Sequence, residues 1–250
     1  MQLLDRLLGR EKLPNDIDAA GLAWGRAQCC SPELLERLVA LSRSRFGWFT
    51  KHLPRTVEYP WVVDVLGSVA GQKILDIGAG VSPVPLALAE AGALVTTVDN
   101  SPSLVGSLDQ IRRGNEWGFL DYATLDPRVR SLHEDVAALK PEEGPFDAVY
   151  SISVIEHMPA EIRRRMFDLI ARSMRRGGSL VLTVDLVPQT TVLWNRASGK
   201  VVESPEEHGT FESMKDELTR LGFELEHEAI VRDIPGVEVE CALIKLKATR

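Results

Sequence analysis

Two glycines and an acid follow the first strongly apolar segment of the chain. They lie in the run Asp76-Ile-Gly-Ala-Gly80, and a second acid, Asp99, ends the next apolar segment. Glycines at such a turn let the backbone bend tightly and let a ligand approach closely, because they carry no Cβ atom. A strand, a glycine turn, a helix and a second strand with an acid at its tip predict a site for the adenosine part of a cofactor.

The rest of this turn argues against a dinucleotide. A pyrophosphate-binding turn reads Gly-x-Gly-x-x-Gly, with the N-terminus of the following helix directed at the phosphates. Here Pro83 occupies the third glycine position. Asp76 adds a carboxylate, which would repel a pyrophosphate and attract an amine or a sulfonium cation. The turn therefore favours a cofactor other than a nicotinamide dinucleotide.

The composition limits the kind of protein that carries this turn. A chain of 250 residues with 44% hydrophobic content can form one sizeable α/β core. The net charge of −7 argues against a general nucleic-acid binder. We find no apolar run that could cross a membrane and no secretory signal. The spacing of Cys29, Cys30 and Cys241 fits neither a disulfide framework nor a zinc site, which predicts reduced thiols in a cytoplasmic protein.

Strand and helix patterns alternate from about residue 72 and must position the turn. Strands are expected at 74–77, 94–99, 129–132, 146–151 and 179–184, and helices at 83–91, 101–117 and 160–174. Gly177-Gly178 is expected to end the last of these helices in a tight turn. The mostly continuous apolar runs are typical of parallel strands buried on both faces.

The end of the chain follows a different pattern. A helix is expected over 211–221, and two strand patterns on either side of Pro235-Gly236 follow it. Two strands joined by a short turn are antiparallel. We therefore expect a doubly wound, Rossmann-like sheet of seven strands, mostly parallel and with the last strand antiparallel.

Two segments are expected to border the site. Residues 1–70 form an N-terminal helical segment with a strong helix start at Ser31-Pro32, and residues 71–250 form the cofactor-binding domain. Residues 186–210 form a long insertion after the fifth strand, at the sheet edge where doubly wound folds place ligands. We expect the N-terminal helices and this insertion to make a lid over a small substrate.

From about Gly71 onward the chain resembles the class I S-adenosylmethionine-dependent methyltransferases. The matching pieces follow in order: Asp76–Gly80, Asp99, His133–Val136, Phe146–Pro159 and Gly177-Gly178. Ser82 stands where many members have a third glycine. The resemblance implies transfer of a methyl group from S-adenosyl-L-methionine to an oxygen or nitrogen of a small-molecule acceptor. From the acidic net charge and the lack of a membrane-spanning apolar run, we expect neither nucleic acid nor membrane as a partner, and the sequence leaves a homodimer open.

The resemblance also implies particular cofactor contacts. Asp99 would bind both ribose hydroxyls and Asn100 would line the adenine side. Asp135 would accept a hydrogen bond from the adenine amino group beside the backbone of Val136, and Glu156 could contact the cofactor's amino group. The expected cofactor-binding residues are Tyr59, Asp76, Gly78, Gly80, Ser82, Asp99, Asn100, Asp135, Val136, Ser151 and Glu156.

The catalytic candidates are groups that could take a proton from the acceptor. His157 leads because histidine titrates near neutral pH and because this residue follows the fourth strand; shaping the methionine pocket is the alternative role. His208 and Asp185 are further candidates. No metal is expected, because Ser153 stands where some members have an acidic ligand and the remaining Glu156-His157 pair is too small a ligand set for a hard cation.

Aromatic walls could stabilise the cation, and ordinary core packing is the alternative for each of them. The candidates are Tyr59, Trp61, Trp117 and Trp194. Two other functions stay open. A nicotinamide-dependent oxidoreductase would need the missing third glycine, and a non-catalytic protein on the same fold would bind the cofactor without turnover.

Overall fold

The computed structural model describes residues 15–101, 116–140, 143–194, 196–197, 200–201 and 206–250. Over these residues the main sheet has the strand order β3-β2-β1-β4-β5-β9-β8. Its strands are β1 (Lys73–Ile77), β2 (Leu94–Val98), β3 (Val129–Leu132), β4 (Phe146–Ile152), β5 (Met174–Leu186), β8 (Phe223–Val231) and β9 (Glu240–Ala248). The first five are parallel, and β9 lies antiparallel between β5 and β8. The predicted seven-stranded Rossmann-like sheet is confirmed.

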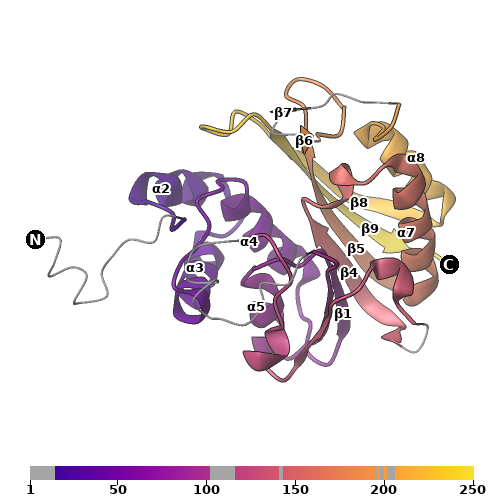
Figure 1. Cartoon of the computed structure of the whole chain (residues 1–250), viewed down its shortest axis with the longest axis horizontal. Coiled ribbons are helices and arrows are strands. Elements are labelled where there is room, and N and C mark those ends of the chain that lie inside the picture. Colours follow the sequence, from indigo (N-terminus) through magenta and orange to yellow (C-terminus); the bar gives the residue numbers. More distant parts are fainter. Residues whose placement is uncertain (1–14, 102–115, 141–142, 195, 198–199, 202–205) are drawn as a thin grey trace, which may run out of the picture.

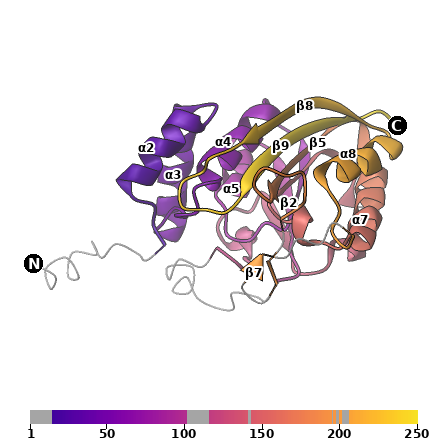
Figure 2. The same cartoon turned by 90° about the horizontal axis from the view of Figure 1, so that it is seen from above.

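Helices cover both faces of this sheet. Figures 1 and 2 show α2 (Ala19–Gln28), α3 (Pro32–Phe46), α4 (Arg55–Leu66) and α5 (Val84–Glu90) on one side, and α7 (Ala160–Ser173) and α8 (Phe211–Arg220) on the other. The strand residues alternate between the two cores: Ile74 packs with the first group of helices and Leu75 with the second. This alternation follows from the period of two in a strand and explains why both faces are apolar.

Helix α4 lies inside the first core. Its residues from Arg55 to Val62 are all buried, although the stretch contains two charged side chains. α4 contacts β4 and β5 as well as α2 and α3. The helices before it are capped by side chains, since Asp18 accepts a hydrogen bond from the backbone of Gly21 and Ser31 from that of Leu34. The N-terminal helices are therefore packed onto the sheet through α4.

The turn expected at Gly177-Gly178 is wrong. Helix α7 ends at Ser173, and β5 begins at Met174 and continues through both glycines. The pairing of β5 with β4 shifts register between Phe146 and Ala148, and Gly177 has a φ of +81°. The glycines therefore lie in an irregularity at the start of the strand, between the pairs that Met174 and Ser179 make with β4.

The remaining expectations concern segments between these elements. Of the helix predicted at 101–117, residues 102–115 lie outside the described part of the chain. The insertion after β5 contains the short strands β6 (Arg196–Ala197) and β7 (Lys200–Val201). Three single turns of 3₁₀ helix are η1 (Tyr122–Thr124), η2 (Val136–Ala138) and η4 (Ile155–His157). No described helix combines the length and the apolar character needed to cross a membrane.

Candidate cofactor and active site

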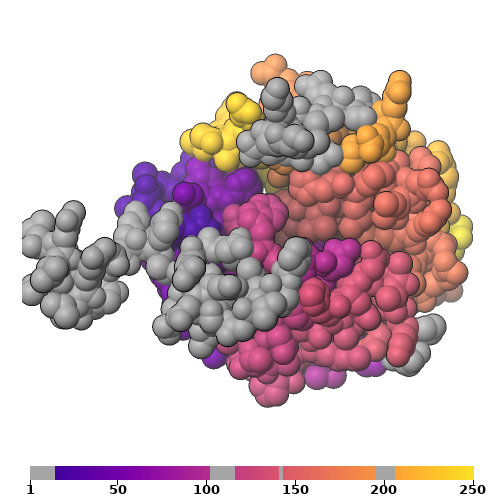
Figure 3. All heavy atoms as spheres, in the orientation of Figure 1, coloured from indigo at the N-terminus to yellow at the C-terminus, as the bar shows by residue number. Residues whose placement is uncertain are grey.

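A cavity of about 650 Å³ lies at the carboxyl ends of β1, β2 and β4. Its wall includes the glycine turn after β1, the tip of β2, the residues around η2 and the start of η4. Two more distant segments complete it, α4 and the α7 helix, which contacts η2. Figure 3 shows the stretch that includes η2 beside α7 on one face of the molecule. The site therefore lies where doubly wound folds bind ligands.

The turn after β1 requires its two glycines. Gly78 and Gly80 have φ angles of +74° and +50°, in the left-handed region. A Cβ atom on Gly78 would lie 2.6 Å from a methyl group of Val154. A Cβ atom on Gly80 would lie 2.7 Å from the carbonyl oxygen of Glu116. The turn is thus closely packed on its outer side, and its own backbone forms part of the cavity wall.

No sequence motif marks the residue that holds this turn. Tyr122 is fully buried, and its hydroxyl accepts a hydrogen bond from the Ser82 backbone nitrogen at 2.7 Å. The same hydroxyl lies within donating distance of the carbonyl oxygens of Gly80, at 2.9 Å, and of Ser82, at 3.1 Å. The Ser82 hydroxyl itself accepts from the backbone of Val84 at the start of α5. Tyr122 therefore helps to fix the backbone at Ser82, the position where many members of the family that the sequence resembles have a third glycine.

The acids predicted for the adenosine end meet in the structure. Asp99 is 8% exposed, and its carboxylate accepts hydrogen bonds from the backbones of Gly80 at 3.0 Å and Ser101 at 2.7 Å. Asn100 donates to Asp135 at 3.1 Å, and Asp135 accepts from the backbone of η2 at 2.8 Å. Each carboxylate oxygen has a second lone pair for a ligand. These residues line one continuous wall with Val136.

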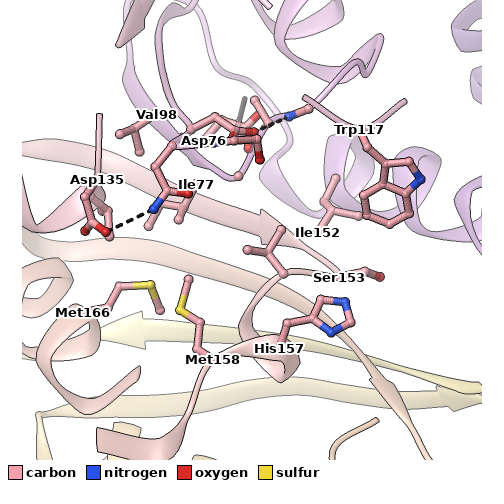
Figure 4. Close-up of a pocket in the computed structure, with 18 of the residues that line it drawn as sticks. Asp76, Ile77, Val98, Trp117, Asp135, Ile152, Ser153, His157, Met158 and Met166 are labelled. Carbon is pink, nitrogen blue, oxygen red and sulfur yellow. Dashed lines mark hydrogen bonds between the residues drawn. The ribbon is translucent and has the colours of Figure 1, made fainter. Parts of the chain in front are cut away.

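The two ends of the cavity differ in chemistry. Figure 4 shows Asp135 at one end with Met158 and Met166 below it, and Ser153, His157 and Trp117 at the other end. The methionines offer soft apolar surface to a flat ring. Trp117 is 61% exposed, so it can contact a second molecule that enters the cavity.

Asp76 is protonated more easily than an ordinary carboxyl. It is 3% exposed, and the Tyr150 hydroxyl donates to it at 2.8 Å. Burial raises the pKa of Asp76 to about 8, with a smaller contribution from the charge of Asp99, although the bond from Tyr150 opposes the shift. The sequence predicted a negative charge at this turn, whereas the buried carboxyl is largely neutral at pH 7.

Behind the cavity wall, Glu58 accepts hydrogen bonds from four side chains. The donors are Arg55, Ser153 at 2.7 Å, Thr183 at 2.5 Å and the thiol of Cys241 at 3.3 Å. Burial would raise the pKa of Glu58, but the Arg55 cation and the hydroxyl donors hold it below its usual value. The carboxylate therefore joins α4 to the ends of β4 and β5 and to β9.

Arg55 extends this network to the cavity, whose wall it joins. Its Nη1 donates to Glu58 and, at 2.6 Å, to Ser153. Burial disfavours the charged guanidinium, but the neighbouring acids, led by Glu58, raise the pKa of Arg55 well above its usual value. The sequence signal that could have found this pair is an Arg and a Glu three residues apart in an otherwise apolar helix.

Ser153 has a backbone conformation that is unusual for a serine. Its φ is +47°, in the left-handed region, and its nitrogen donates to the backbone and side chain of Thr183. Such a conformation costs on the order of 1 kcal/mol, so surrounding contacts must maintain it. The consequence is a sharp bend that carries Val154 and His157 to the cavity.

Three predicted residues lie behind this wall. Glu156 is fully buried and accepts a hydrogen bond from the backbone of Asp185 at 3.1 Å, and Ser151 donates to the carbonyl oxygen of Ile77 at 2.9 Å. Burial raises the pKa of Glu156 well above its usual value and that of Asp185 to about 7, and each is raised further by a neighbouring acid. Within the described chain, none of the three borders the cavity.

The two histidine candidates have different surroundings. His157 lines the cavity, and its ring meets the edge of the Trp194 ring at a centroid distance of 5.8 Å. His208 is 4% exposed and lies outside the described cavity wall; its carbonyl oxygen accepts a hydrogen bond from the buried Arg163. Only His157 is therefore placed to meet a ligand directly.

The aromatic candidates divide in the same way. Tyr59 is buried and, like Trp117, lines the cavity. Trp61 packs instead against His227, with the ring centroids 5.9 Å apart. Trp194 reaches the site through its contact with His157.

One group of acid and thiol side chains could in principle hold a metal. Ligand atoms of Glu58, Asp185 and Cys241 all lie within 4.8 Å of one another. The Glu58 carboxylate, however, already receives Arg55 and two hydroxyl groups. A cation at this position would face the fixed guanidinium charge, so the expectation of no metal stays our prediction.

Comparisons with known proteins agree with this architecture. Residues 74–178 match the family described as "Methyltransferase domain". A ubiquinone biosynthesis O-methyltransferase of Xylella fastidiosa is 29% identical over 143 residues, which are 55% of this chain and 54% of that protein. The enzyme of the same name from Xanthomonas oryzae is 34% identical over 115 residues, 46% of this chain and 44% of that protein. The chain spans about half the length of these curated relatives.

Solved structures share the fold. A 1,6-didemethyltoxoflavin-N1-methyltransferase of Burkholderia thailandensis, with bound 1,6-didemethyltoxoflavin and S-adenosylhomocysteine, has a TM-score of 0.55 and 15% identity, over 92% of this chain and 85% of the other. Magnesium protoporphyrin IX methyltransferase of Synechocystis PCC 6803, with bound S-adenosylmethionine, has a TM-score of 0.52 and 20% identity over 76% of each chain. The solved structures therefore agree with the Rossmann-like fold of the sheet, and the family match places a stretch similar to a methyltransferase domain over β1 to the start of β5.

Proposed function

We propose that this chain transfers a methyl group from S-adenosylmethionine to an oxygen or nitrogen of a small-molecule acceptor. The observation that carries the proposal is the hydrogen bond from the Gly80 backbone to Asp99, which joins the glycine turn to the acid at the tip of β2. This arrangement presents the backbone of the turn and a carboxylate to the same cavity. The cavity volume lies in the range typical of sites for small organic ligands.

The residues around the cavity fit the parts of this cofactor. Asp99 would hold the ribose hydroxyls through the free lone pairs of its carboxylate, and Asn100, Asp135 and Val136 would surround the adenine. The close packing outside Gly78 and Gly80 keeps their backbone in the wall, as a ligand that lies against the turn requires. The fit therefore rests on a preformed set of donors, acceptors and apolar contacts.

Bound S-adenosylmethionine supplies a methyl group that is already activated on a sulfonium. The protein's contribution is then to orient the acceptor and to exclude water, and orientation alone can contribute on the order of 7–11 kcal/mol. Tyr59 and Trp117 would wall the reacting end with aromatic faces. His157 would accept the proton of the acceptor, because it is the histidine in the wall and neutral imidazole is an effective base near pH 7.

The contacts of the segments expected to form a lid favour a small acceptor that the protein encloses. Arg55 and Tyr59 of α4 contribute directly to the cavity wall, and Trp194 of the insertion 186–210 contacts His157. On this basis we propose that residues 1–70 and 186–210 form a lid over the acceptor. The acidic net charge supports a small metabolite over a nucleic acid, and the unpaired cysteines support a cytoplasmic location.

The proposal includes both oxygen and nitrogen as the acceptor atom. The similar proteins include, by name, an O-methyltransferase and an N1-methyltransferase. Fold alone does not determine which atom is methylated. A base at His157 would serve a hydroxyl acceptor and a protonated amine alike, because both must lose a proton.

Incubation with S-adenosylmethionine labelled in the methyl group and a metabolite extract tests the proposal. We expect label in a small-molecule product and none in nucleic acid. Repeated absence of product from a protein that binds S-adenosylhomocysteine would instead support the non-catalytic alternative. An Asp99→Ala sample in the same extract controls for transfer by contaminating enzymes, since it should show little label.

A further inference from the structure

Beside the cavity, the ring of Trp194 packs against the ring of His157. The two ring centroids lie 5.8 Å apart and the ring planes meet at 68°, which is an edge-to-face arrangement. His157 lines the cavity, whereas Trp194 lies outside the described wall. Aromatic rings in this geometry attract each other by about 0.5–1.5 kcal/mol beyond the area that they bury. Trp194 therefore restricts the orientation of the imidazole from behind the wall.

The backbone of Asp185 holds both partners of this contact. Its nitrogen donates at 3.1 Å to Oε1 of Glu156, the residue directly before His157. Its carbonyl oxygen accepts a hydrogen bond from the backbone nitrogen of Trp194 at 2.8 Å. Asp185 itself is buried near the end of β5, which lies between β4 and β9 in the sheet. A strand with neighbours on both sides therefore brings together two rings that are far apart in the chain.

Further pairs anchor the segment that carries Trp194. Leu186 and Leu193 form an antiparallel bridge, and both side chains are fully buried. The backbone nitrogen of Leu193 also donates to the carbonyl oxygen of Gly209 at 3.3 Å, which ties the segment to the approach to α8. Backbone that is buried and hydrogen-bonded in this way opens less readily than an exposed loop. The start of the insertion is therefore a firm support for the Trp194 ring.

The indole nitrogen of Trp194 gains no hydrogen bond at this position. Its Nε1 atom is shielded from solvent and has no partner in the described structure. A buried N–H group without an acceptor costs about 1–3 kcal/mol. Pairing of the polar group thus does not explain where the ring lies, and an unsatisfied group in a native structure calls for another reason. The contact with His157 supplies that reason.

We propose that Trp194 is a positioning residue for His157 and holds the imidazole in the orientation that accepts the proton of the acceptor. This inference rests on the proposed function and extends it to a residue outside the cavity wall. A general base must lie roughly 2.6–3.2 Å from the atom whose proton it takes. An imidazole that turns away from this position loses catalysis, while the cofactor still binds. The insertion then supports the chemical step in addition to enclosing the acceptor.

A double-mutant cycle tests the assignment. The measurement is the initial rate of label transfer from saturating methyl-labelled S-adenosylmethionine to a metabolite extract. We expect Trp194→Leu to lower this rate about tenfold and Trp194→Phe, which keeps an aromatic ring, to lower it by less than about threefold. In a His157→Ala background, Trp194→Leu should change the rate by less than about twofold, because the base through which it acts is gone. The calorimetric affinity for S-adenosylhomocysteine should stay within about twofold in both Trp194 variants, which also shows that they fold.

His227→Ala is the matched control. It breaks a similar contact, between His227 and Trp61 at a centroid distance of 5.9 Å, outside the described cavity wall, and should leave the rate within about twofold. The same fractional loss from Trp194→Leu with and without His157 would overturn the assignment, as would an unchanged rate in Trp194→Leu. A parallel loss of affinity for S-adenosylhomocysteine would also overturn it, since Trp194 would then shape the cavity. A wild-type protein that transfers no label would overturn the proposed function itself, and this inference with it.

Discussion

The two ends of the cavity are built in different ways. At the adenosine end, Asp99 and Asp135 each follow a strand, and each carboxylate accepts a hydrogen bond from a backbone nitrogen two residues later in the chain. The longer links at this end, from Gly80 to Asp99 and from Asn100 to Asp135, span 19 and 35 residues. At the opposite end, Glu58 binds Ser153 and Thr183, which are 95 and 125 residues distant in the chain. The first end is a set of local turns, whereas the second depends on the packing of α4 against the finished sheet.

This difference has a thermodynamic consequence. Local turns can form wherever their strands form, and most of their polar atoms remain near solvent. The second end encloses an ion pair that is nearly inaccessible to water, with exposed fractions of 7% and 0% for its two side chains. Breaking a buried pair leaves an uncompensated charge and costs far more than breaking a surface pair. Substitutions at the second end should therefore affect folding as well as binding.

Glu58→Gln is expected to have the largest effect. It leaves the Arg55 cation without its buried partner and should lower the free energy of unfolding by about 3 kcal/mol. Chemical denaturation measures this loss. Glu161→Gln is the matched control, because it removes the exposed i,i+4 pair with Arg165 and should change stability by less than about 0.5 kcal/mol. Similar small losses in both variants would show that the two ends do not differ as we describe.

His157→Ala should mainly affect turnover. Loss of a general base typically lowers kcat by about a hundredfold, and we expect the affinity for S-adenosylhomocysteine to stay within about threefold. His208→Gln is the comparison, since this histidine lies outside the described cavity wall and should leave kcat of the folded protein within about twofold. If His157→Ala abolished binding and had no separate effect on chemistry, His157 would only shape the pocket.

Much of this arrangement could be predicted from the sequence, for physical reasons. The strand segments along the chain followed from apolar runs and turns, and Asp99 could be placed at the ligand edge because it ends a predicted parallel strand. Asp135 was named from the family resemblance. The spacing of Arg55 and Glu58 in an apolar helix could have marked them as a pair, but their contacts with Ser153 and Thr183 could not be predicted, since no local pattern records which distant side chain a buried charge will meet. The Gly177-Gly178 turn was predicted wrongly because two glycines suit a bulge as well as a helix end.

Tyr122→Phe tests how far the glycine turn at the adenosine end depends on one distant hydroxyl. The change leaves the buried Ser82 nitrogen without an acceptor and should cost about 1–2 kcal/mol of stability. We expect the affinity for S-adenosylhomocysteine to fall about fivefold, as measured by calorimetry, because the turn loses its support. An unchanged affinity would show that the turn holds its shape without Tyr122.

Asp76→Asn should have an effect that depends on pH. The folded-state pKa of Asp76 is raised, mainly by burial, to about 8. Its contribution to stability is therefore fully present below the unfolded-state pKa near 4 and is lost as pH rises toward 8. Thermal unfolding should show the variant gaining stability relative to the wild type between pH 5 and pH 8. A difference that is constant over this range would contradict the raised pKa.

Calorimetric titration of the wild-type and Asp99→Ala proteins with S-adenosylhomocysteine and with NADH tests the central claim most directly. The carboxylate of Asp99 is the group that joins the glycine turn to the predicted ribose site. We predict binding of S-adenosylhomocysteine to the wild type, a loss of more than tenfold in Asp99→Ala, and no binding of NADH. Heat with NADH alone, or an Asp99→Ala protein with unchanged affinity for S-adenosylhomocysteine, would contradict this account of the site.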